Sequence, residues 1–468
     1  MKFQILSHAG LLVEHKGIKV LTDPWLLGSC YWRSWWNFPE PPRLVIENIE
    51  PDYIYLTHLH WDHFHGPSLR KLFNPDVKFI VPKVQTTRMV DDLRWLGFTN
   101  IFEIPHGKEL KIGDDFHLAS YQFGLGVDSA VVFSGGGTTI LNANDCKLFG
   151  MALKQLLSRF PKIDFALRSH SNASPIPYCV NDYRQWLTGY KSAADYIDEF
   201  CRFCLSINAR YAVPFASNHC FLRKDTVKFN EFVVTPDVIP ARYSELALLT
   251  NKVSECVVMT PGSTWSQANG FDVLAFDYSR RSDYILAMLD RNALKLEEQY
   301  NRENDAVADF RLFSEYFNGF IRSIPWVLRK IFRLQILFRI VDRSGEHLWL
   351  IDMVGGRVKT LNTGSLGYVT ITTPAFVLND CCSTRMFSTW TPSKLLRIYL
   401  RSDQDLKRVN LFFFLLDFYE LDILPVRKNF SWRAISNRFA RWREGIEALK
   451  LLVKYTFGKR RFQLKNHY

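Results

Sequence analysis

The chain has 468 residues, of which 47% are hydrophobic and 15% aromatic, and it carries a formal net charge of +12. This length and apolar content can fill more than one hydrophobic core, so we expect two globular units. The longest apolar run, Leu411 to Leu416, is far shorter than the roughly 20 residues that cross a bilayer, which excludes a transmembrane helix. The N-terminus lacks the basic and apolar regions of a secretory signal. Nine scattered cysteines form no disulfide framework, which predicts a reducing, cytoplasmic setting.

Most of the excess positive charge lies at the C-terminal end. Residues 425–468 hold 12 lysines and arginines against two glutamates, a net charge of +10. Apolar residues from Trp432 to Val453 recur there at helical spacing, which predicts a basic amphipathic helix. Such a helix can dock on a membrane surface, on a partner protein or on the body of the chain, and the last is the simplest interpretation. No nucleic-acid-binding motif accompanies the charge, so we expect no specific nucleic-acid partner.

The first sixty residues alternate short β-rich runs with turns. The runs between Phe3 and Leu21 predict a β-meander. An aromatic loop, Tyr31 to Trp36, follows it, and its rings form either a wall of a substrate site or part of the core. Next comes a strand of buried type, Tyr53 to Leu56, which leads directly into a run of histidines.

Strands and helices alternate after the histidines. We predict a helix over Val84 to Leu96, a hairpin of Ser129–Phe133 with Thr138–Leu141, a long helix ending near Ile207, and further strands at residues 165–167 and 211–214. This succession predicts an α/β fold, a four-layer αββα sandwich with the site on loops at one edge. The pattern changes near residue 266 to a polar helix, later strands and the basic tail. We therefore predict a catalytic domain over residues 1–265 and an α+β domain over residues 266–468.

Three histidines and an aspartate lie within six residues at the end of the predicted strand, in the run Thr57-His58-Leu59-His60-Trp61-Asp62-His63. His58 and His60 are two residues apart in an extended segment, so both side chains can point the same way and hold one divalent cation. Asp62 and His63 lie on the following turn and can face a second cation. A carboxylate beside imidazoles suits zinc or iron, and we predict two divalent metal ions, with zinc ahead of iron.

Later segments supply further candidate ligands. Asp145 follows the hairpin and could bridge both cations, and His219 follows the strand at residues 211–214 as the natural last ligand. His170 is either a ligand, a substrate contact or an ordinary loop residue. His8 and Asp23 lie at strand ends of the meander, where we expect groups that orient the ligating imidazoles.

The histidine run resembles the HxHxDH signature of the metallo-β-lactamase superfamily. Other segments resemble the catalytic portion of the CMP-N-acetylneuraminate hydroxylase group over about Met1 to Thr264, namely Ser7-His8-Ala9, Thr22-Asp23-Pro24-Trp25-Leu26, Trp35-Trp36, Tyr53-Ile54-Tyr55, Asp145-Cys146, Pro214-Phe215-Ala216 and Thr260-Pro261-Gly262. The resemblance implies an αββα fold and a binuclear site with the ligands His58, His60, Asp62, His63, Asp145 and His219.

Two departures from these families affect the expected chemistry. The hydroxylases carry a Rieske iron–sulfur domain with Cys-x-His and Cys-x-x-His pairs, and these pairs are not found in the sequence. Oxygenation would then need electrons from a separate partner. Superfamily members also have a histidine in the segment before the hairpin, where this chain has Phe123 to Asp128. Asp128, His117 or His170 could take its place as a ligand.

Three functions are compatible with this site. The first is metal-assisted hydrolysis of a small anionic ester, amide or phosphoester, with Asp62 as the catalytic residue that orients the attacking water and moves its proton. The second is a diiron oxygenase acting on a nucleotide sugar or related small molecule. The third is a non-catalytic interaction protein on a decayed fold. Metal identity and dependence on O₂ separate the first two.

Overall fold

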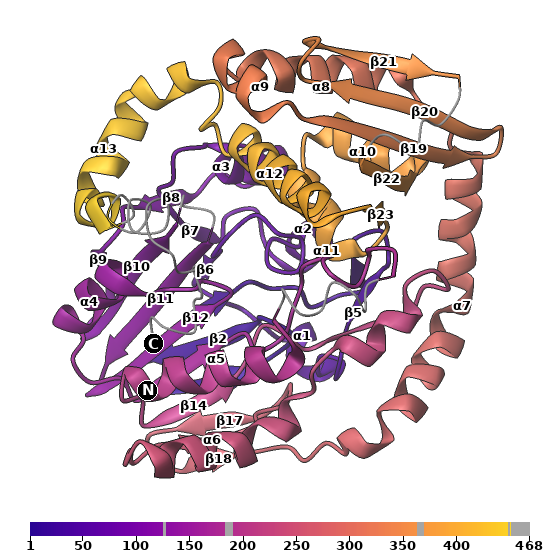
Figure 1. Ribbon diagram of the computed structural model, residues 1–468. Coiled ribbons are helices and arrows are strands. Elements are labelled where there is room, and N and C mark those ends of the chain that lie inside the picture. Colours follow the sequence, from indigo (N-terminus) through magenta and orange to yellow (C-terminus); the bar gives the residue numbers. More distant parts are fainter. Residues whose placement is uncertain (125–127, 183–190, 363–368, 448–449, 451–468) are drawn as a thin grey trace.

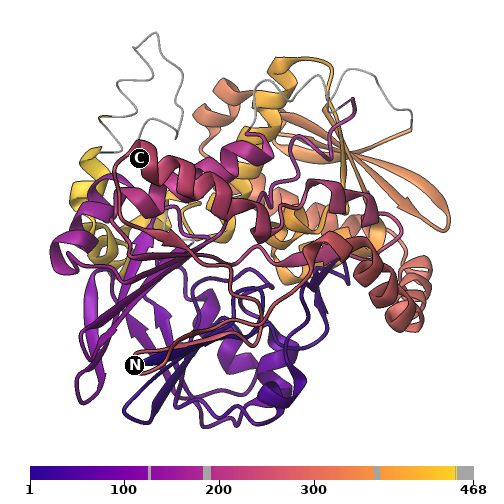
Figure 2. The same cartoon turned by 90° about the horizontal axis from the view of Figure 1, so that it is seen from below.

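The computed structural model describes residues 1–124, 128–182, 191–362, 369–447 and 450. Two large sheets lie face to face, and helices cover the outer side of each one (Figures 1 and 2). A third, five-stranded sheet with its own helices forms the C-terminal part of the molecule. The α/β class, the four-layer αββα arrangement and the mixed C-terminal part predicted from the sequence are thus confirmed.

The first sheet has eight strands in the order β18-β17-β1-β2-β3-β6-β7-β8. The predicted meander is its antiparallel half, and β3, β6, β7 and β8 pair in parallel. The bounds are β1 Lys2–Ile5, β2 Leu11–His15, β3 Ile18–Thr22, β6 Tyr53–Tyr55, β7 Lys78–Pro82, β8 Ile101–Ile104, β17 Thr264–Ser266 and β18 Gly270–Asp272.

The second sheet has seven strands in the order β16-β14-β13-β12-β11-β10-β9. Its antiparallel half includes the predicted hairpin, formed by β11 and β12, and the remaining strands pair in parallel. The bounds are β9 Lys108–Gly113, β10 Phe116–Phe123, β11 Asp128–Gly135, β12 Thr138–Asn144, β13 Phe165–Arg168, β14 Tyr211–Pro214 and β16 Glu255–Cys256.

The layers follow from the alternation of side chains along each strand. On β12, Ile140 packs into the core between the two sheets, whereas Leu141 packs under the helices on the outer side. On β6, Tyr55 packs into the core between the two sheets, whereas Ile54 packs under the helices on the outer side. The outer helices of the first sheet are α1 Arg43–Glu47, α2 Gly66–Leu72 and α3 Arg88–Trp95, and those of the second are α4 Gly150–Arg159, α5 Ala193–Ser206 and α6 Ile239–Leu249.

The helix predicted over Val84 to Leu96 starts later, at Arg88. The backbone before it has other partners, since Val84 O accepts a hydrogen bond from Arg433 Nε at 2.7 Å. The long helix predicted to end near Ile207 is α5, which ends at Ser206 with Ile207 as its C-cap.

The C-terminal sheet has the order β21-β20-β19-β22-β23 and packs against helices of the same region. Its strands are β19 Gln335–Asp342, β20 Gly345–Asp352, β21 Arg357–Leu361, β22 Val369–Pro374 and β23 Arg397–Tyr399. The helices of this part are α7 Arg281–Asp305, α8 Phe310–Ser323, α9 Trp326–Phe332, α10 Ala375–Thr384, α11 Trp390–Ser393, α12 Asp403–Glu420 and α13 Trp432–Ala440. None of the helices in the described ranges combines the length and apolarity needed to cross a bilayer.

The aromatic loop is core and not a wall of an open site. Tyr31, Trp32 and Trp35 are buried in one apolar cluster with residues of α8, β19 and α12. The indole N–H groups of Trp32 and Trp35 donate to Asp380 Oδ2 at 2.7 Å and to Pro392 O at 2.9 Å. This loop therefore joins the sandwich to the C-terminal part. The division of the chain at residue 265 stays a prediction, and β17 and β18 extend the first sheet to Asp272.

Candidate metal centre

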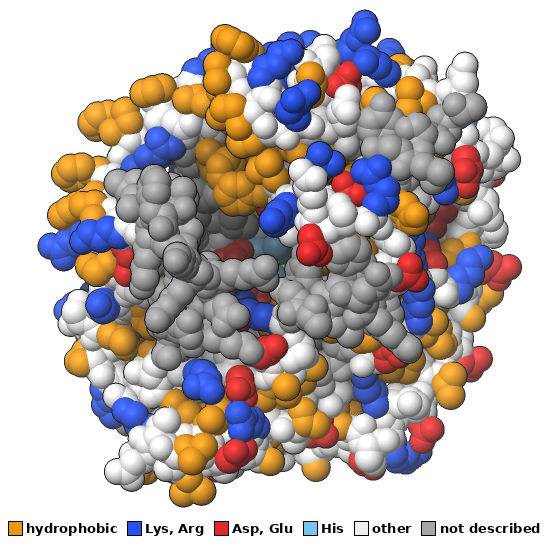
Figure 3. Space-filling model, viewed as in Figure 1, with side chains coloured by type: hydrophobic (Ala, Val, Ile, Leu, Met, Phe, Trp, Pro, Cys, Tyr) orange, Lys and Arg blue, Asp and Glu red, His pale blue; other side chains and the backbone are white. Residues whose placement is uncertain are grey.

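The candidate ligands lie on loops and strand ends at one edge of the sandwich. His58 and His60 follow β6, His8 lies between β1 and β2, Asp128 begins β11, and Asp145 follows β12. Strand ends that meet at one edge bring together side chains that are far apart in sequence. Histidine is visible at the floor of a hollow on this face of the molecule (Figure 3).

Seven side chains form three overlapping groups, in each of which the possible ligand atoms lie within 4.8 Å of one another. The groups are His58, His60 and Asp128; His58, His63 and Asp145; and His8, Asp62 and His63. His58 belongs to the first two groups and His63 to the last two. The seven residues therefore form one continuous cluster of imidazoles and carboxylates, the donor set expected for zinc or iron.

Asp128 is one of the residues that the sequence analysis considered as a substitute for a missing histidine ligand. Its Oδ1 lies 3.9 Å from His58 Nε2, and His58 Nε2 lies 2.9 Å from His60 Nδ1. His117, another residue considered for this role, is on β10 beside Glu109 and belongs to none of the three groups. Among the alternatives left open by the sequence, the structure brings Asp128 to the histidines.

Asp62 is held by two neighbours. The Tyr31 hydroxyl donates a hydrogen bond to Asp62 Oδ1, and His8 Nε2 lies 3.1 Å from Asp62 Oδ2. His8 was expected to orient ligands from outside the cluster, but its ring nitrogen is close enough to be a ligand itself. The sequence analysis considered the loop of Tyr31 as a substrate wall or as core, and did not predict this hydrogen bond to Asp62.

Asp23 lies behind the cluster, as expected of a residue that orients a ligand. Its Oδ2 lies 2.8 Å from His63 Nδ1 and accepts a hydrogen bond from Thr57 Oγ1 at 2.7 Å, and its Oδ1 accepts one from the Thr57 N–H at 2.8 Å. The carboxylate thereby fixes the His63 ring with Nε2 directed toward Asp145 Oδ2, which is 3.3 Å away.

We expect Asp23→Asn to weaken metal binding by about 10- to 100-fold, the usual cost of losing a group that orients a ligating histidine. The amide keeps the size of the side chain but cannot accept hydrogen bonds at both positions. Metal titration of the two proteins measures the effect. Asp52→Asn is the matched control, because Asp52 also accepts a backbone N–H, that of Lys19 at 2.8 Å, but lies on the surface. Equal metal affinity of Asp23→Asn and the wild type would contradict the role of Asp23.

His219 and His170 are near the cluster but outside its three groups. The His219 ring stacks on Trp35 with centroids 3.6 Å apart, and it lies 5.7 Å from the His8 ring. His170 is fully buried, and its backbone N–H donates to Ser217 Oγ at 3.0 Å. The structure therefore does not bring either residue into contact with the other predicted ligands. Their roles as ligands stay predictions.

Burial sets the charge state of the imidazoles. It lowers the pKa of His58 and of His60 to about 4, so both rings are neutral near pH 7 and keep a lone pair for a cation. For His63 burial acts in the same direction, but the carboxylates of Asp62 and Asp23 outweigh it and raise its pKa well above the usual value. A net negative set of carboxylates thus surrounds His63, an arrangement that attracts positive charge.

The candidate ligand atoms are placed to surround a cation and are not placed to form hydrogen bonds with one another. His63 Nε2 and Asp128 Oδ1 are buried and make no hydrogen bond with the described residues. Asp145 Oδ2 and Asp62 Oδ2 lie 3.3 and 3.6 Å from His63 Nε2, so the atoms converge without being aligned for hydrogen bonds. A divalent cation among them would satisfy these atoms, which are costly to bury unpaired.

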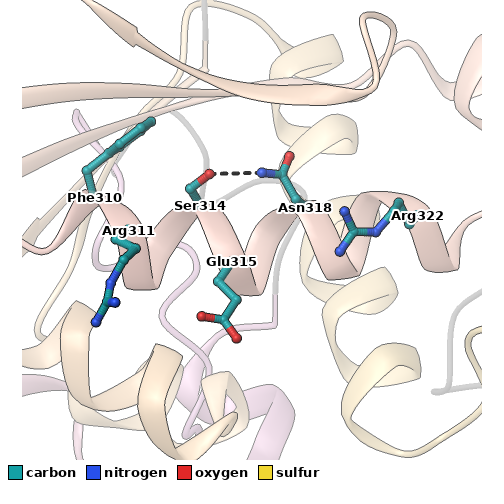
Figure 4. Close-up of a pocket in the computed structure, with 6 residues that line it drawn as sticks. All are labelled: Phe310, Arg311, Ser314, Glu315, Asn318 and Arg322. Carbon is teal, nitrogen blue, oxygen red and sulfur yellow. Dashed lines mark hydrogen bonds between the residues drawn. The ribbon is translucent and has the colours of Figure 1, made fainter.

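A second depression, of about 460 Å³, lies along α8 in the C-terminal part (Figure 4). It contains no histidine or cysteine, and its polar lining includes the hydrogen bond from Asn318 Nδ2 to Ser314 Oγ, 2.8 Å long. Nothing in its lining supplies the metal-ligand chemistry of the histidine cluster. We therefore place the candidate active site at the cluster.

Comparison with known proteins agrees with this geometry. Residues 2–148 match the model of the family described as the beta-lactamase superfamily domain. This part of the chain is therefore similar to that domain. The predicted resemblance is thereby confirmed, and the fold of the sandwich is that of a metallo-β-lactamase. Members of this superfamily are usually enzymes.

Two curated relatives match part of the chain. A protein of Mycolicibacterium smegmatis named as a Rieske 2Fe-2S iron–sulfur protein is 29% identical over 242 residues, which cover 49% of this chain and 46% of that protein. Cytidine monophosphate-N-acetylneuraminic acid hydroxylase of Xenopus laevis is 32% identical over 149 residues, 30% of this chain and 25% of the hydroxylase. The chain thus spans about half the length of the mycobacterial relative and a quarter of the hydroxylase.

One similar solved structure is an isothiocyanate hydrolase from Delia radicum gut bacteria. It is 18% identical, covers 57% of this chain and 99% of its own, and superposes with a TM-score of 0.42.

Proposed function

We propose that the chain is a metal-dependent hydrolase that acts on a small anionic ester, amide or phosphoester. The observation that carries this proposal is the convergence of seven imidazole and carboxylate side chains in three overlapping groups at the edge of the sandwich. In this proposal, His58, His60 and Asp128 would hold one divalent cation, and His63, Asp145, Asp62 and His8 would hold a second. Zinc is the first expectation for this donor set, ahead of iron.

When bound, such cations polarise an acceptor oxygen and lower the pKa of water toward neutrality. The chain's own part in the reaction lies with Asp62. Its Oδ2 faces His8 and its Oδ1 is held by the Tyr31 hydroxyl, so the carboxylate has one fixed orientation. Burial and the charge of Asp62 hold the pKa of Tyr31 well above its usual value, which keeps the phenol protonated as a donor. Asp62 Oδ2 is then available to accept and return the proton of the attacking water.

The anionic substrate follows from positive charge beside the cluster. Lys147 is two residues after Asp145, and its Nζ donates to Ser169 Oγ at 2.8 Å. Arg168 and Lys191 both contact Glu199, so three cations lie near the carboxylates of Glu199 and Asp145. An anionic group of a substrate would balance this excess and would be drawn toward the ligands.

An oxygenase is the second candidate, and the similarity to cytidine monophosphate-N-acetylneuraminic acid hydroxylase favours it. Imidazole with carboxylate also suits iron. In that case the substrate would be a nucleotide sugar or a related small molecule, and a separate protein would have to supply the electrons.

The test is elemental analysis and an absorption spectrum of protein purified without chelator, followed by assays of phosphodiester, lactone and amide substrates with and without O₂. Bound zinc and O₂-independent hydrolysis are the expected results, and Lys147→Met should raise KM for anionic substrates more than for neutral analogues. Lys154→Met, which removes an exposed ammonium from α4, is the control. Bound iron with an O₂ requirement would favour the oxygenase, and failure to take up any metal would overturn both functions.

A further inference from the structure

The helix of the basic tail has its polar side toward the protein and its apolar side toward solvent. Trp432, Ile435, Phe439, Trp442 and Ile446 recur at intervals of three and four residues, so they follow one side of the helical segments that begin with α13. Trp432 is 82% exposed and Phe439 78%, and the other three are at least 44% exposed. The tail helix does lie on the body of the chain, the simplest interpretation of the sequence, but these five apolar side chains do not face that body. Leu449 and Val453 of the predicted stripe lie outside the described residues.

Charged groups attach the helix to the body instead. Arg433 Nη1 donates to Glu103 Oε2 at 2.9 Å, and Arg441 Nη2 donates to Gly124 O at 2.7 Å. Glu444 Oε1 lies 3.3 Å from His106 Nε2. These contacts fix which side of the helix faces outward. The outward stripe is thus part of the folded structure and does not result from a loose end of the chain.

A second helix has the same character. In α9 every residue is at least partly exposed, with Trp326 67% and Ile331 65% exposed. Its sequence alternates apolar residues with Arg329 and Lys330, and Arg333 follows as the C-cap. Both helices lie on the upper outer rim of the molecule in Figure 1, and α13 is again at the outer edge in Figure 2. In Figure 3 apolar side chains gather along this rim with Lys and Arg among them.

We propose that this rim, formed by α9, α13 and residues 442–446, is a docking surface for an anionic lipid bilayer. Tryptophan and phenylalanine rings that project from the outer edge of a molecule can enter the interfacial region of a membrane. Exposed cations of the same segments, Lys330 on α9 with Arg438 and Arg443 in the tail, match the negative charge of anionic head groups. The two helices lie on an outer edge of the molecule, which suits a broad lipid surface.

The proposal predicts binding of the full chain to vesicles of phosphatidylcholine with phosphatidylserine, measured by co-sedimentation. Binding should be much weaker to phosphatidylcholine alone and should fall as salt is added, because head-group attraction is screened. The double variant W432S/F439S should bind at least tenfold more weakly than the wild type. The control L248S/L249S removes two side chains that are equally exposed, 82% and 73%, but lie on α6, and it should bind like the wild type.

Three results would overturn the proposal. The first is that the full chain stays in the supernatant with anionic vesicles, and the second is that W432S/F439S binds them as well as the wild type does. Light scattering could instead find a concentration-dependent dimer that W432S/F439S abolishes, with no vesicle binding, and the stripe would then be an interface between two copies of this chain. All four side chains are exposed, so folding of both variants should be unaffected, and circular dichroism checks it.

Discussion

Replacing His58 by alanine should remove nearly all metal binding and lower any hydrolytic rate by more than about 100-fold. Loss of a group that only orients a ligand costs about 10- to 100-fold in metal affinity or activity, and loss of a shared ligand should exceed that. His58 belongs to two of the three ligand groups, so its removal leaves His60 with Asp128, and His63 with Asp145, one donor short. Metal content per chain and the rise in melting temperature on adding zinc measure the effect.

His106→Ala is the matched control for His58→Ala. Both histidines are buried, but His106 lies outside the three groups, where its Nδ1 accepts the Gln122 N–H at 3.0 Å. Both variants lose a buried ring, so a loss of stability that is common to both would result from the lost packing. A loss of metal binding that occurs only in His58→Ala would show that His58 is a metal ligand. If His58→Ala binds metal as tightly as His106→Ala does, the cluster is not the metal site.

Arg223→Met should lower the free energy of unfolding by about 3–5 kcal/mol, the range for removing one partner of a buried ion pair. The guanidinium is 1% exposed, and its hydrogen bonds to Glu303 Oε2 and Asp225 Oδ2 are both 2.8 Å long. It also donates to Trp32 O at 2.9 Å. The substitution leaves two carboxylates without their cation at the contact between α7 and the sandwich. Denaturant unfolding measures the change.

Arg242→Met provides the comparison for Arg223→Met. Arg242 also contacts two carboxylates, at 2.7 Å to Asp198 and 2.8 Å to Glu245, but its side chain is 35% exposed. Water screens such a pair and solvates the carboxylates when the cation is removed, so we expect a much smaller loss of stability. Equal losses in the two variants would show that burial of the Arg223 network contributes little.

The sequence predicted the sandwich and the candidate ligands that are adjacent in the chain because both depend on local patterns. The continuous apolar run Tyr53 to Leu56 predicts the strand, and the HxHxDH spacing that follows predicts that His58 and His60 point the same way. Asp145 was also predicted, since the hairpin of β11 and β12 ends directly before it.

Other features could not be predicted because they depend on contacts between distant segments. Asp128 reaches His58 only after β11 pairs with β12. His8 reaches Asp62 only when the loop between β1 and β2 lies against the loop that follows β6. The position of His219 is set by its stacking on Trp35, a residue 184 positions earlier in the chain. The outward direction of the tail stripe depends on Arg433 and Arg441 meeting partners on β8 and beyond β10. Helical spacing alone reports that a stripe exists, but not which way it faces.

The buried contact between the aromatic loop and the C-terminal part has an evolutionary consequence. The indoles of Trp32 and Trp35 and the hydroxyl of Ser34 donate to acceptors between residues 380 and 393. A recombination event that exchanged only one half of the gene would leave these donors buried without acceptors, at about 1–3 kcal/mol for each. Descendants of this lineage should therefore keep or lose both halves together, and substitutions at Trp32, Ser34 and Trp35 should be accompanied by changes in the segment around α10 and α11.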